Sequence, residues 1–330
     1  MISVYLVVWV ATGHWTGEGC TSRADIIGTV NKSLLTLDSR GNDMDELAGI
    51  ILAAGEGSRM KSRTPKVLHC LCGKELLRFP VELLGRLGMT RIVVVVSPAN
   101  REAIKGLLGD TVEYTVQEAR TGTAGAVESA ASMLQGQFEQ VVVIGGDAPL
   151  VAEDSVRRLI DGHIQDSRQM SILSGIVQVN QGLGRISRDL GSQQNVLGIV
   201  EANDDTGRTG EPIEINSGVY CFQADWLWEN LRKVGAGKSQ ERYLTDLAAI
   251  GTGKGDAVAA VVADDPDEVM GINTRVELAR LEDIQRRRIR ERWMLEGVTI
   301  TDPSSVMIDD AVVIGQDTVL LPNTMLLGST

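Results

Sequence analysis

Short apolar runs alternate with helical stretches from Ala48 onward. The runs AGIILAA, RIVVVVS, VEYTV and QVVVIGG are separated by segments such as REAIKGLLG and TAGAVESAASML. Strands with so few polar positions are typical of a sheet buried on both faces, as in a parallel sheet covered by helices. The first half of the chain is therefore predicted to be a doubly wound α/β domain.

The pattern loosens after residue 165. Further strands are predicted in MSILSGIVQV, GIVEAN and INSGVYCF, which make the sheet mixed but mainly parallel and complete a domain of residues 44–272. Residues 273–296 are predicted to form a linker helix, because apolar residues recur along one rough stripe. The stripe consists of Val276, Leu278, Leu281, Ile284 and Ile289. The basic stretch QRRRIRER within this helix is interpreted as a solvated face.

The last segment, residues 297–330, has an apolar residue at every sixth position. These residues are Ile308, Ile314, Leu320 and Leu326. A six-residue period is typical of a three-sided parallel β-helix, and about one coil is present, whereas repeat folds need several. We therefore expect residues 297–330 to be the truncated start of such a domain.

Residues 1–43 show no sustained period and are interpreted as an unstructured or non-native extension, with Met44 as a candidate initiator. The alternative is a genuine arm of the protein. The run from Met1 to Ala11 is apolar, but no Lys or Arg precedes it and it is too short to cross a bilayer. No other apolar run is long enough, so we expect no membrane association.

Composition limits the partners. With 43% hydrophobic and 23% charged residues, the chain has the composition of a folded globular protein. Its 44 acidic and 32 basic residues give a net charge of −12, which argues against general nucleic-acid binding and requires any phosphate site to be local. Four cysteines are too few for a disulfide framework and fit a cytoplasmic protein. His69, Cys70 and Cys72 lack a second ligand pair for zinc.

The strongest chemical signal is IILAAGEGSRMKSRTPKVLH, residues 50–69. Gly55 and Gly57 allow backbone amides to approach a phosphate chain, and Arg59 and Lys66 add positive charge. The loop follows a strand, at the edge where open α/β sheets bind ligands. Neither the dinucleotide fingerprint nor the Walker loop is present. A glycine pair alone would indicate a turn, but these offsets together predict a phosphate-binding loop.

This loop closely resembles the signature of the sugar-nucleotide pyrophosphorylases. Further segments occur in the order of the GlmU family, in which an N-acetylglucosamine-1-phosphate uridylyltransferase is joined to a glucosamine-1-phosphate acetyltransferase. These segments are GGDAPL (145–150), GLGRI (182–186), GIVEAND (198–204), EINSGVY (214–220), ERYLTD (241–246) and GINTR (271–275). The resemblance covers residues 46–330. It implies a Rossmann-like nucleotide-diphospho-sugar transferase domain, a linker helix and a left-handed β-helix.

The resemblance also implies a magnesium site formed by Asp147 and Asn273. One carboxylate and one neutral oxygen suit Mg²⁺, which takes its other ligands from phosphate and water. Arg59 and Lys66 are the implied catalytic residues. On residues alone, an Asp that follows an apolar strand more often begins a turn.

The implied substrate-binding residues include Gln117 as the reader of the nucleobase and three contacts for the sugar, Gly184, Glu201 and Asn216. An amide both donates and accepts, as a uracil edge requires. Without the resemblance, Gln117 could be a surface residue and Asn216 a packing residue. The family often has GTGHA where this chain has GTAGA, so Ala124 and Gly125 depart from it. The implied set is Leu52, Ala53, Ala54, Gly55, Gly57, Lys66, Gln117, Gly122, Thr123, Gly184, Glu201, Asn216 and Asn273.

The implied reaction converts UTP and N-acetylglucosamine-1-phosphate into UDP-N-acetylglucosamine and pyrophosphate, for cell-wall and lipopolysaccharide precursors. The sugar phosphate is already an anionic nucleophile, so an in-line attack on the α-phosphorus needs no side-chain base. The family's acetyltransferase site and trimer contacts lie in the long β-helix. We therefore expect no acetyl transfer from this chain, and its single coil puts the homotrimer in question.

Three alternatives stay open at this point. The chain could use a different hexose phosphate or dTTP, or it could be a catalytically silent binding subunit. A glycosyltransferase is disfavoured, because such enzymes usually carry a DxD metal motif. The acidic pair Asp264 and Asp265 lacks the strand context of that motif.

Overall fold

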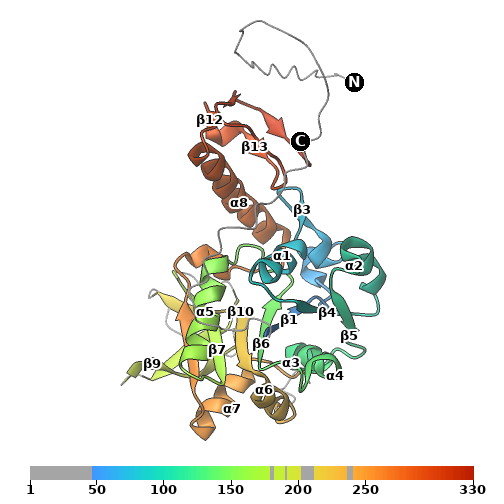
Figure 1. Ribbon diagram of the computed structural model, residues 1–330, viewed down its shortest axis with the longest axis vertical. Helices are drawn as coiled ribbons and strands as arrows, with labels where there is room; N and C mark the ends of the chain where they lie inside the picture. The colour runs from blue at the N-terminus through green and yellow to red at the C-terminus, as the bar shows by residue number, and fades with distance from the viewer. Residues whose placement is uncertain (1–46, 179–181, 190–191, 202–211, 236–240) are drawn as a thin grey trace, which may run out of the picture.

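A mixed sheet forms the centre of the protein in a computed structural model that describes residues 47–178, 182–189, 192–201, 212–235 and 241–330 (Figure 1). The prediction for residues 1–43 lies outside these ranges. The strand order is β11-β7-β10-β6-β1-β4-β5, with β8 and β9 attached through β10. The strands are β1 (Leu47–Leu52), β4 (Arg91–Val96), β5 (Glu113–Val116), β6 (Gln140–Gly145), β7 (Met170–Val177), β8 (Arg185–Asp189), β9 (Ser192–Val200), β10 (Ile213–Gln223) and β11 (Val258–Val262).

The direction of the strands changes along the sheet. β1 is parallel to β4 and β6, β4 is parallel to β5, and β7 is parallel to β11. β10 is antiparallel to β6, β7 and β8, and β8 is antiparallel to β9. The prediction of a mixed, mainly parallel α/β sheet is therefore confirmed.

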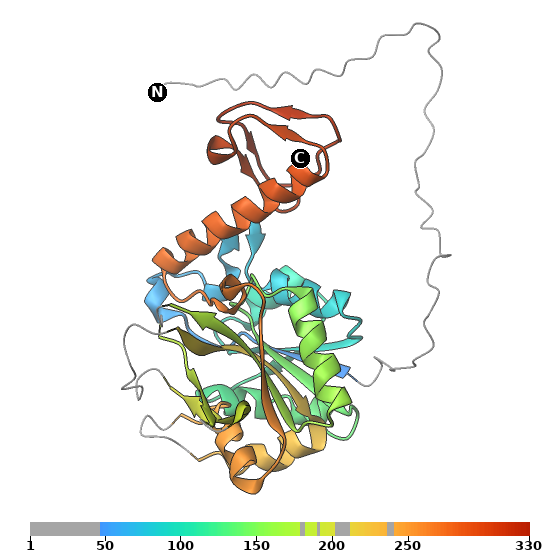
Figure 2. The same ribbon diagram turned by 90° about the vertical axis from the view of Figure 1, so that its left-hand side faces the viewer.

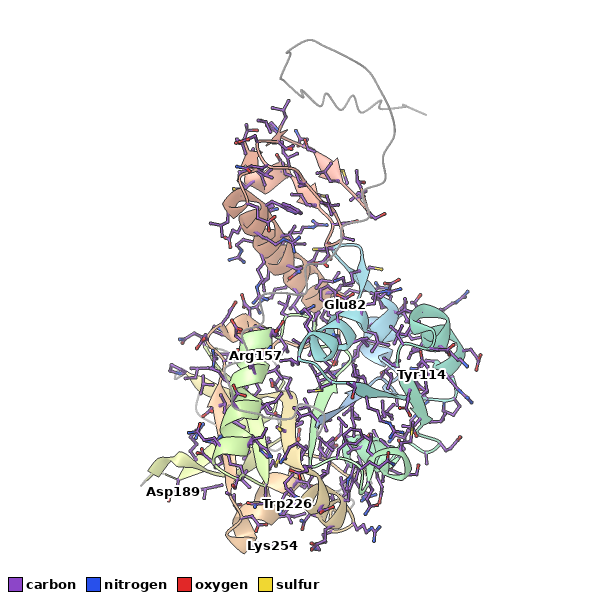
Figure 3. The ribbon with its side chains drawn as sticks, in the orientation of Figure 1. Glu82, Tyr114, Arg157, Asp189, Trp226 and Lys254 are labelled. Atoms are coloured by element: carbon purple, nitrogen blue, oxygen red, sulfur yellow. The ribbon has the colours of Figure 1, made fainter. Side chains whose placement is uncertain are left out.

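Helices cover both faces of the sheet because side chains of each central strand alternate between two cores. Ile51 and Val94 pack into one core with α1, α2 and α5, whereas Ile50 and Val93 pack into the other with α3, α4, α6 and α7. Strand β5 differs from expectation: it lies at the sheet edge and is half-buried, and Tyr114 lies at that margin (Figure 3). The helices are α1 (Arg78–Arg86), α2 (Arg101–Leu108), α3 (Gly122–Glu128), α4 (Ala131–Leu134), α5 (Glu153–Gln165), α6 (Ala224–Leu231) and α7 (Asp246–Lys254).

Helix α8 (Arg275–Leu295) leads away from the sheet toward the C-terminal strands (Figure 2). A capping box begins it: the Thr274 side chain accepts from the Glu277 amide, and the Glu277 carboxylate accepts from the amides of Thr274 and Asn273, both at 2.7 Å. Val276 is 80% exposed, so its place in the predicted apolar stripe was wrong. The buried side chains of α8 are Leu281, Ile284, Ile289 and Trp293.

Four short strands follow α8 and pair in parallel, β12 with β14 and β13 with β15. Their apolar side chains pack with the end of α8 in a separate core: Ile308 and Leu320 are buried, and Ile314 and Leu326 pack against them. The strands are β12 (Thr299–Ile300), β13 (Met307–Ile308), β14 (Val319–Leu320) and β15 (Met325–Leu326). Residues 299–326 are called the C-terminal strands below.

A hairpin of β2 (Cys70–Leu71) and β3 (Lys74–Glu75) extends from the sheet domain and packs against the C-terminal strands. Cys72 is buried in the core of the C-terminal strands, and its carbonyl accepts from the Asp310 amide at 2.9 Å. Gly73 has a φ of +76°, and a Cβ there would lie 2.4 Å from the Asp309 carboxylate. Only glycine fits this turn, which fixes the hairpin against the C-terminal strands.

Within the described ranges, no helix is both long and apolar enough to cross a membrane.

Candidate functional site

A cleft of about 680 Å³ lies at the carboxyl ends of β1 and β6. One side, called the loop wall, consists of residues 52–59 and 117–123. The other, called the strand wall, consists of residues 182–184, Glu201, 216–220 and 241–245. The structure places these predicted site residues in the lining: Leu52, Ala54, Gly55, Gly57, Arg59, Lys66, Gln117, Gly122, Thr123, Asp147, Gly184, Glu201, Asn216 and Asn273.

Ala53 is the exception among the predicted site residues. Its side chain is 1% exposed and belongs to the core beneath the sheet. Its amide donates to the Val95 carbonyl at 2.9 Å and so continues the β1 ladder. Ala53 is therefore a structural residue of the strand end, because alternate side chains of a strand point to opposite sides.

Lys66, Asp147 and Asn273 meet at the floor of the cleft. The Lys66 ammonium donates to Asp147 Oδ2 and, at 3.1 Å, to Asn273 Oδ1. Lys66 begins a 3-10 helix, η3 (Lys66–Leu68), Asp147 follows β6, and Asn273 precedes α8. Two oxygens from distant segments thus converge on one positive charge. This donor set, a carboxylate and an amide oxygen, fits a magnesium ion.

Local backbone geometry brings Lys66 to this floor. Gly57 has a φ of +61°, and a Cβ there would lie 2.5 Å from Lys66 Cβ, so the glycine lets the lysine stem pack against the loop. The Gly146 amide donates to the Leu52 carbonyl at 2.9 Å and joins the loop of Asp147 to the end of β1. Arg59 lies in η2 (Ser58–Met60), is exposed and lines the cleft. Within the described part of the chain its guanidinium has no acidic partner.

Gln117 is held firmly in the loop wall. Its amide donates to the Val96 carbonyl at 2.8 Å, and its side-chain Nε2 donates to the Gly122 carbonyl at 3.0 Å. Gly122 has a φ of +85° and would meet the Arg242 carbonyl, 2.4 Å away, if it carried a Cβ. Thr123 Oγ1 accepts from the Leu244 amide at 2.9 Å. The two walls are therefore hydrogen-bonded to each other at this end of the cleft.

In the strand wall, polar side chains are oriented by their neighbours. Asn216 Oδ1 accepts from the Gly218 amide at 3.0 Å, while Asn216 Nδ2 donates to the Tyr220 hydroxyl at 2.6 Å. Burial raises the pKa of Tyr220, so its phenol stays neutral. Glu201 Oε1 accepts from the Thr245 hydroxyl at 2.5 Å. One carboxylate and one amide thus face the cleft in fixed orientations.

The sequence pattern missed several lining residues. Glu56 and Arg120 form an ion pair that joins the two segments of the loop wall. Tyr220 and Glu241 line the strand wall, where Glu241 accepts from the Tyr243 hydroxyl at 2.9 Å. Arg120 stands three residues after Gln117, which is the only sequence signal that could have drawn attention to it.

Comparison with known proteins agrees with this architecture. Residues 48–284 match the nucleotidyl transferase family, and the chain belongs to that family. The sequence is 41% identical over 87% of its length to a protein from Caldanaerobacter subterraneus subsp. tengcongensis named bifunctional protein GlmU, and covers 62% of that relative. Proteins of the same name from Halalkalibacterium halodurans and an Exiguobacterium species are 38% and 40% identical over 87% and 86% of the chain, which covers 63% of each.

The resemblance to GlmU that the motifs predict is therefore confirmed. The chain spans about three fifths of the length of the curated relatives it matches.

Proposed function

We propose that this protein is a sugar-1-phosphate nucleotidyltransferase that forms UDP-N-acetylglucosamine and pyrophosphate from UTP and N-acetylglucosamine-1-phosphate. The observation that carries the proposal is the meeting of Lys66, Asp147 and Asn273 on the floor of one cleft, between a glycine-rich loop and a wall of sugar-compatible polar groups. The relatives named GlmU support the choice of substrates.

The loop wall would bind the nucleotide. Backbone amides next to Gly55 and Gly57 accommodate phosphate oxygens closely, while Arg59 and Lys66 neutralise their charge. Gln117 is oriented by Gly122, so its amide edge is available to a pyrimidine without a loss of side-chain entropy on binding. The loop wall would therefore bind the triphosphate and fix its orientation.

Asp147 and Asn273 would hold a magnesium ion, because their oxygens already converge on a cation position. When bound, Mg²⁺ neutralises charge on the phosphates of the nucleotide. Lys66, whose ammonium contacts both oxygens in the structure, would supply a second, covalently fixed positive charge on the same floor of the cleft. The phosphate of the sugar is already ionised near neutral pH, so the protein orients the nucleophile and needs no general base.

The strand wall would select the sugar. Glu201 accepts hydrogen bonds from hydroxyl groups, and Asn216 can pair with an N-acetyl group; a sugar that lacks these groups leaves buried polar atoms unpaired. Asn216 is only 7% exposed, which makes such a mismatch costly.

We also propose that residues 44–272 form the catalytic domain, residues 273–296 the linker and residues 297–330 the start of a left-handed β-helix. Met307 pairs with Met325, an offset of 18 residues, which equals three sides of six residues. The pairing of Thr299 with Val319 has an offset of 20 residues, which implies two extra residues at one corner. Hydrogen exchange tests this: the Met307 and Asp309 amides, which donate to the Thr324 and Leu326 carbonyls at 2.9 Å, should be protected.

The decisive experiment for the activity combines UTP, Mg²⁺ and N-acetylglucosamine-1-phosphate and follows UDP-sugar and pyrophosphate together. Equimolar release of both products is expected, and chelation of the metal should stop it. Glucose-1-phosphate, dTTP and CTP serve as a substrate panel. Faster turnover of another nucleotide and sugar phosphate would mean a different substrate specificity. Binding without turnover would mean a catalytically silent subunit.

A further inference from the structure

A second cavity of about 300 Å³ lies behind the catalytic cleft. Its walls come from β3, α1, the loop between β6 and α5, α8 and the C-terminal strands. Ala148 lines both this cavity and the cleft, so the loop that carries Asp147 separates the two spaces. The cavity shares no other lining residue with the cleft.

The lining of this second cavity is rich in charge. It contains four cations and two carboxylates, a net charge of +2 within a chain whose net charge is −12. The cations are Lys74, Arg86, Arg288 and Arg292, and the carboxylates are Glu82 and Asp310. Arg86 and Arg288 also pair with carboxylates outside the lining, so an anion would be bound by the guanidinium donors that stay unpaired and not by the net charge.

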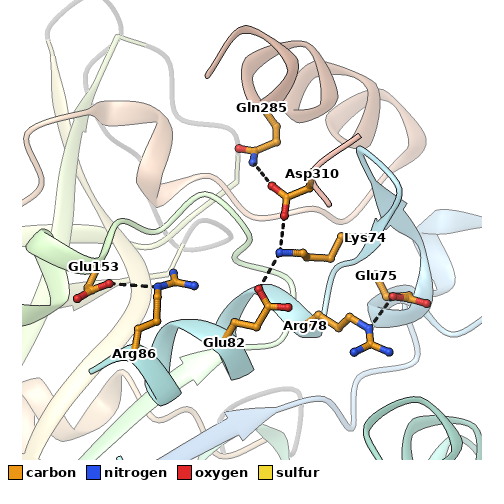
Figure 4. Close-up of polar contacts among 8 residues, drawn as sticks. All are labelled: Lys74, Glu75, Arg78, Glu82, Arg86, Glu153, Gln285 and Asp310. Carbon is orange, nitrogen blue, oxygen red and sulfur yellow. Dashed lines mark hydrogen bonds and ion pairs between the residues drawn. The ribbon is translucent and has the colours of Figure 1, made fainter. Parts of the chain in front are cut away.

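Two of the cations, Lys74 and Arg288, are already paired with groups of the protein. Lys74 pairs with both Glu82 and Asp310, and Gln285 donates to Asp310 at 3.2 Å (Figure 4). Arg288 donates to the Leu150 carbonyl at 3.0 Å and to Asp265 at 2.6 Å. These contacts fix the shape of the cavity, because they tie α8 to the loop behind Asp147 and to β3.

The other two cations keep donors available. Only Nε of Arg86 is paired, with Glu153 at 3.1 Å, which leaves both terminal nitrogens of that guanidinium. In the described ranges Arg292 has no acidic partner, and its guanidinium lies over the Trp293 ring at 5.2 Å from the centroid. Stacked, planar guanidinium groups are well suited to phosphate oxygens.

We propose that this cavity binds a small phosphorylated polyhydroxy compound, with the phosphate on Arg86 and Arg292 and the hydroxyl groups on Glu82 and Asp310. A bare phosphate would be repelled by the two carboxylates, whereas hydroxyl groups donate to them. The volume lies at the lower end of the range for ligand sites and suits a sugar phosphate. This site is separate from the proposed active site.

Titration calorimetry with glucose 6-phosphate tests the proposal, with orthophosphate as a second arm. Saturable binding of glucose 6-phosphate is expected for the wild-type chain and for Lys66→Ala, which alters only the cleft. The double substitution Arg86→Glu and Arg292→Glu should weaken binding at least tenfold. Arg280→Glu, the same change on an exposed part of α8 outside the cavity, is the matched control and should have no effect.

Each outcome of these titrations either supports or overturns the proposed sugar-phosphate site. Absence of saturable binding would overturn the proposal, as would binding that Lys66→Ala abolishes and the double variant retains, because the ligand would then occupy the cleft. Orthophosphate that binds as tightly as glucose 6-phosphate would overturn the role of Glu82 and Asp310. Circular dichroism of the double variant verifies that it folds, and the single variant Arg292→Gln, expected to weaken binding severalfold, replaces it if it does not.

Discussion

The two walls of the cleft are built in different ways. Most of the loop wall comes from one short stretch at the end of β1, among parallel strands, and glycines set its shape. The strand wall is assembled from antiparallel β10, from the residues just before β8 and just after β9, and from a segment that returns at residues 241–245. A phosphate chain is the same in every nucleotide and can be bound by one motif, whereas recognition of one sugar needs groups from several segments.

The largest effect is expected at the floor, where the two walls meet. Lys66→Ala or Asp147→Ala should lower kcat by about 10³-fold or more, roughly 4 kcal/mol of transition-state stabilisation, because the first removes positive charge at the reacting phosphates and the second removes a proposed ligand of the magnesium ion. Steady-state kinetics with pyrophosphate detection measures this. Lys61→Ala, a neighbouring exposed lysine outside the cleft lining, should behave like the wild type. Near-normal pyrophosphate release from either floor variant would remove that residue from the site.

His163 joins the halves of the sheet that support the two walls. Its Nδ1 is 2.9 Å from Ser171 Oγ of β7, and its Nε2 is 3.0 Å from Gln140 Oε1 of β6. Burial, with a smaller contribution from the Arg168 charge, lowers the pKa of His163 from 6.5 to about 4. The unfolded chain therefore binds the proton first as the pH falls.

We expect this histidine to contribute a loss of up to about 3 kcal/mol in the free energy of unfolding as the pH falls from 6.5 to 4. Denaturant titrations at a series of pH values should show the loss, and His163→Gln should flatten it over that window. A variant with an unchanged pH slope would mean that other groups dominate the acid sensitivity.

The substitution Glu201→Gln tests whether the strand wall binds the sugar phosphate independently of the nucleotide. Loss of the carboxylate should raise KM for N-acetylglucosamine-1-phosphate about 10- to 100-fold, and KM for UTP should stay within about twofold. Varying each substrate at saturating concentrations of the other gives both constants. Equal changes in both would show that Glu201 acts through the shape of the cleft, since Thr245 hydrogen-bonds to it.

The substitution Gln117→Ala tests the loop wall in the same way, and a smaller effect is expected. The preference for UTP over CTP should fall about tenfold, because one polar contact with the base edge is lost. KM for the sugar phosphate should not move. Competition between the two nucleotides in one reaction reports the ratio directly, and an unaltered ratio would assign base recognition to the backbone of the loop wall.

The sequence was most informative where local rules decide the structure. The strand and glycine loop of residues 50–69, the linker helix and the six-residue apolar period all follow from spacing within a few residues. The prediction for VEYTV failed to place β5 at the edge, because an apolar run does not report how many neighbours a strand has. Val276 lies on the exposed side of the first turn of α8, where a rough stripe is a poor guide.

The convergence of the cleft residues could be inferred only through the family resemblance. Asp147 and Asn273 are 126 positions apart, and their approach depends on the packing of α8 against the loop after β6. The Glu56–Arg120 ion pair likewise depends on how two loops meet in space. No pattern in one sequence encodes such a contact directly.

The hairpin of β2 and β3 links the C-terminal strands to the floor of the cleft. Its turn packs against Asp309 and accepts a hydrogen bond from the Asp310 amide, and it follows the 3-10 helix of Lys66 after a single residue, His69. A tilt of the C-terminal strands would therefore reach Lys66, which the proposed mechanism places at the reacting phosphates, within a few residues of the chain. A partner that binds the C-terminal strands would therefore restrict the movement of Lys66.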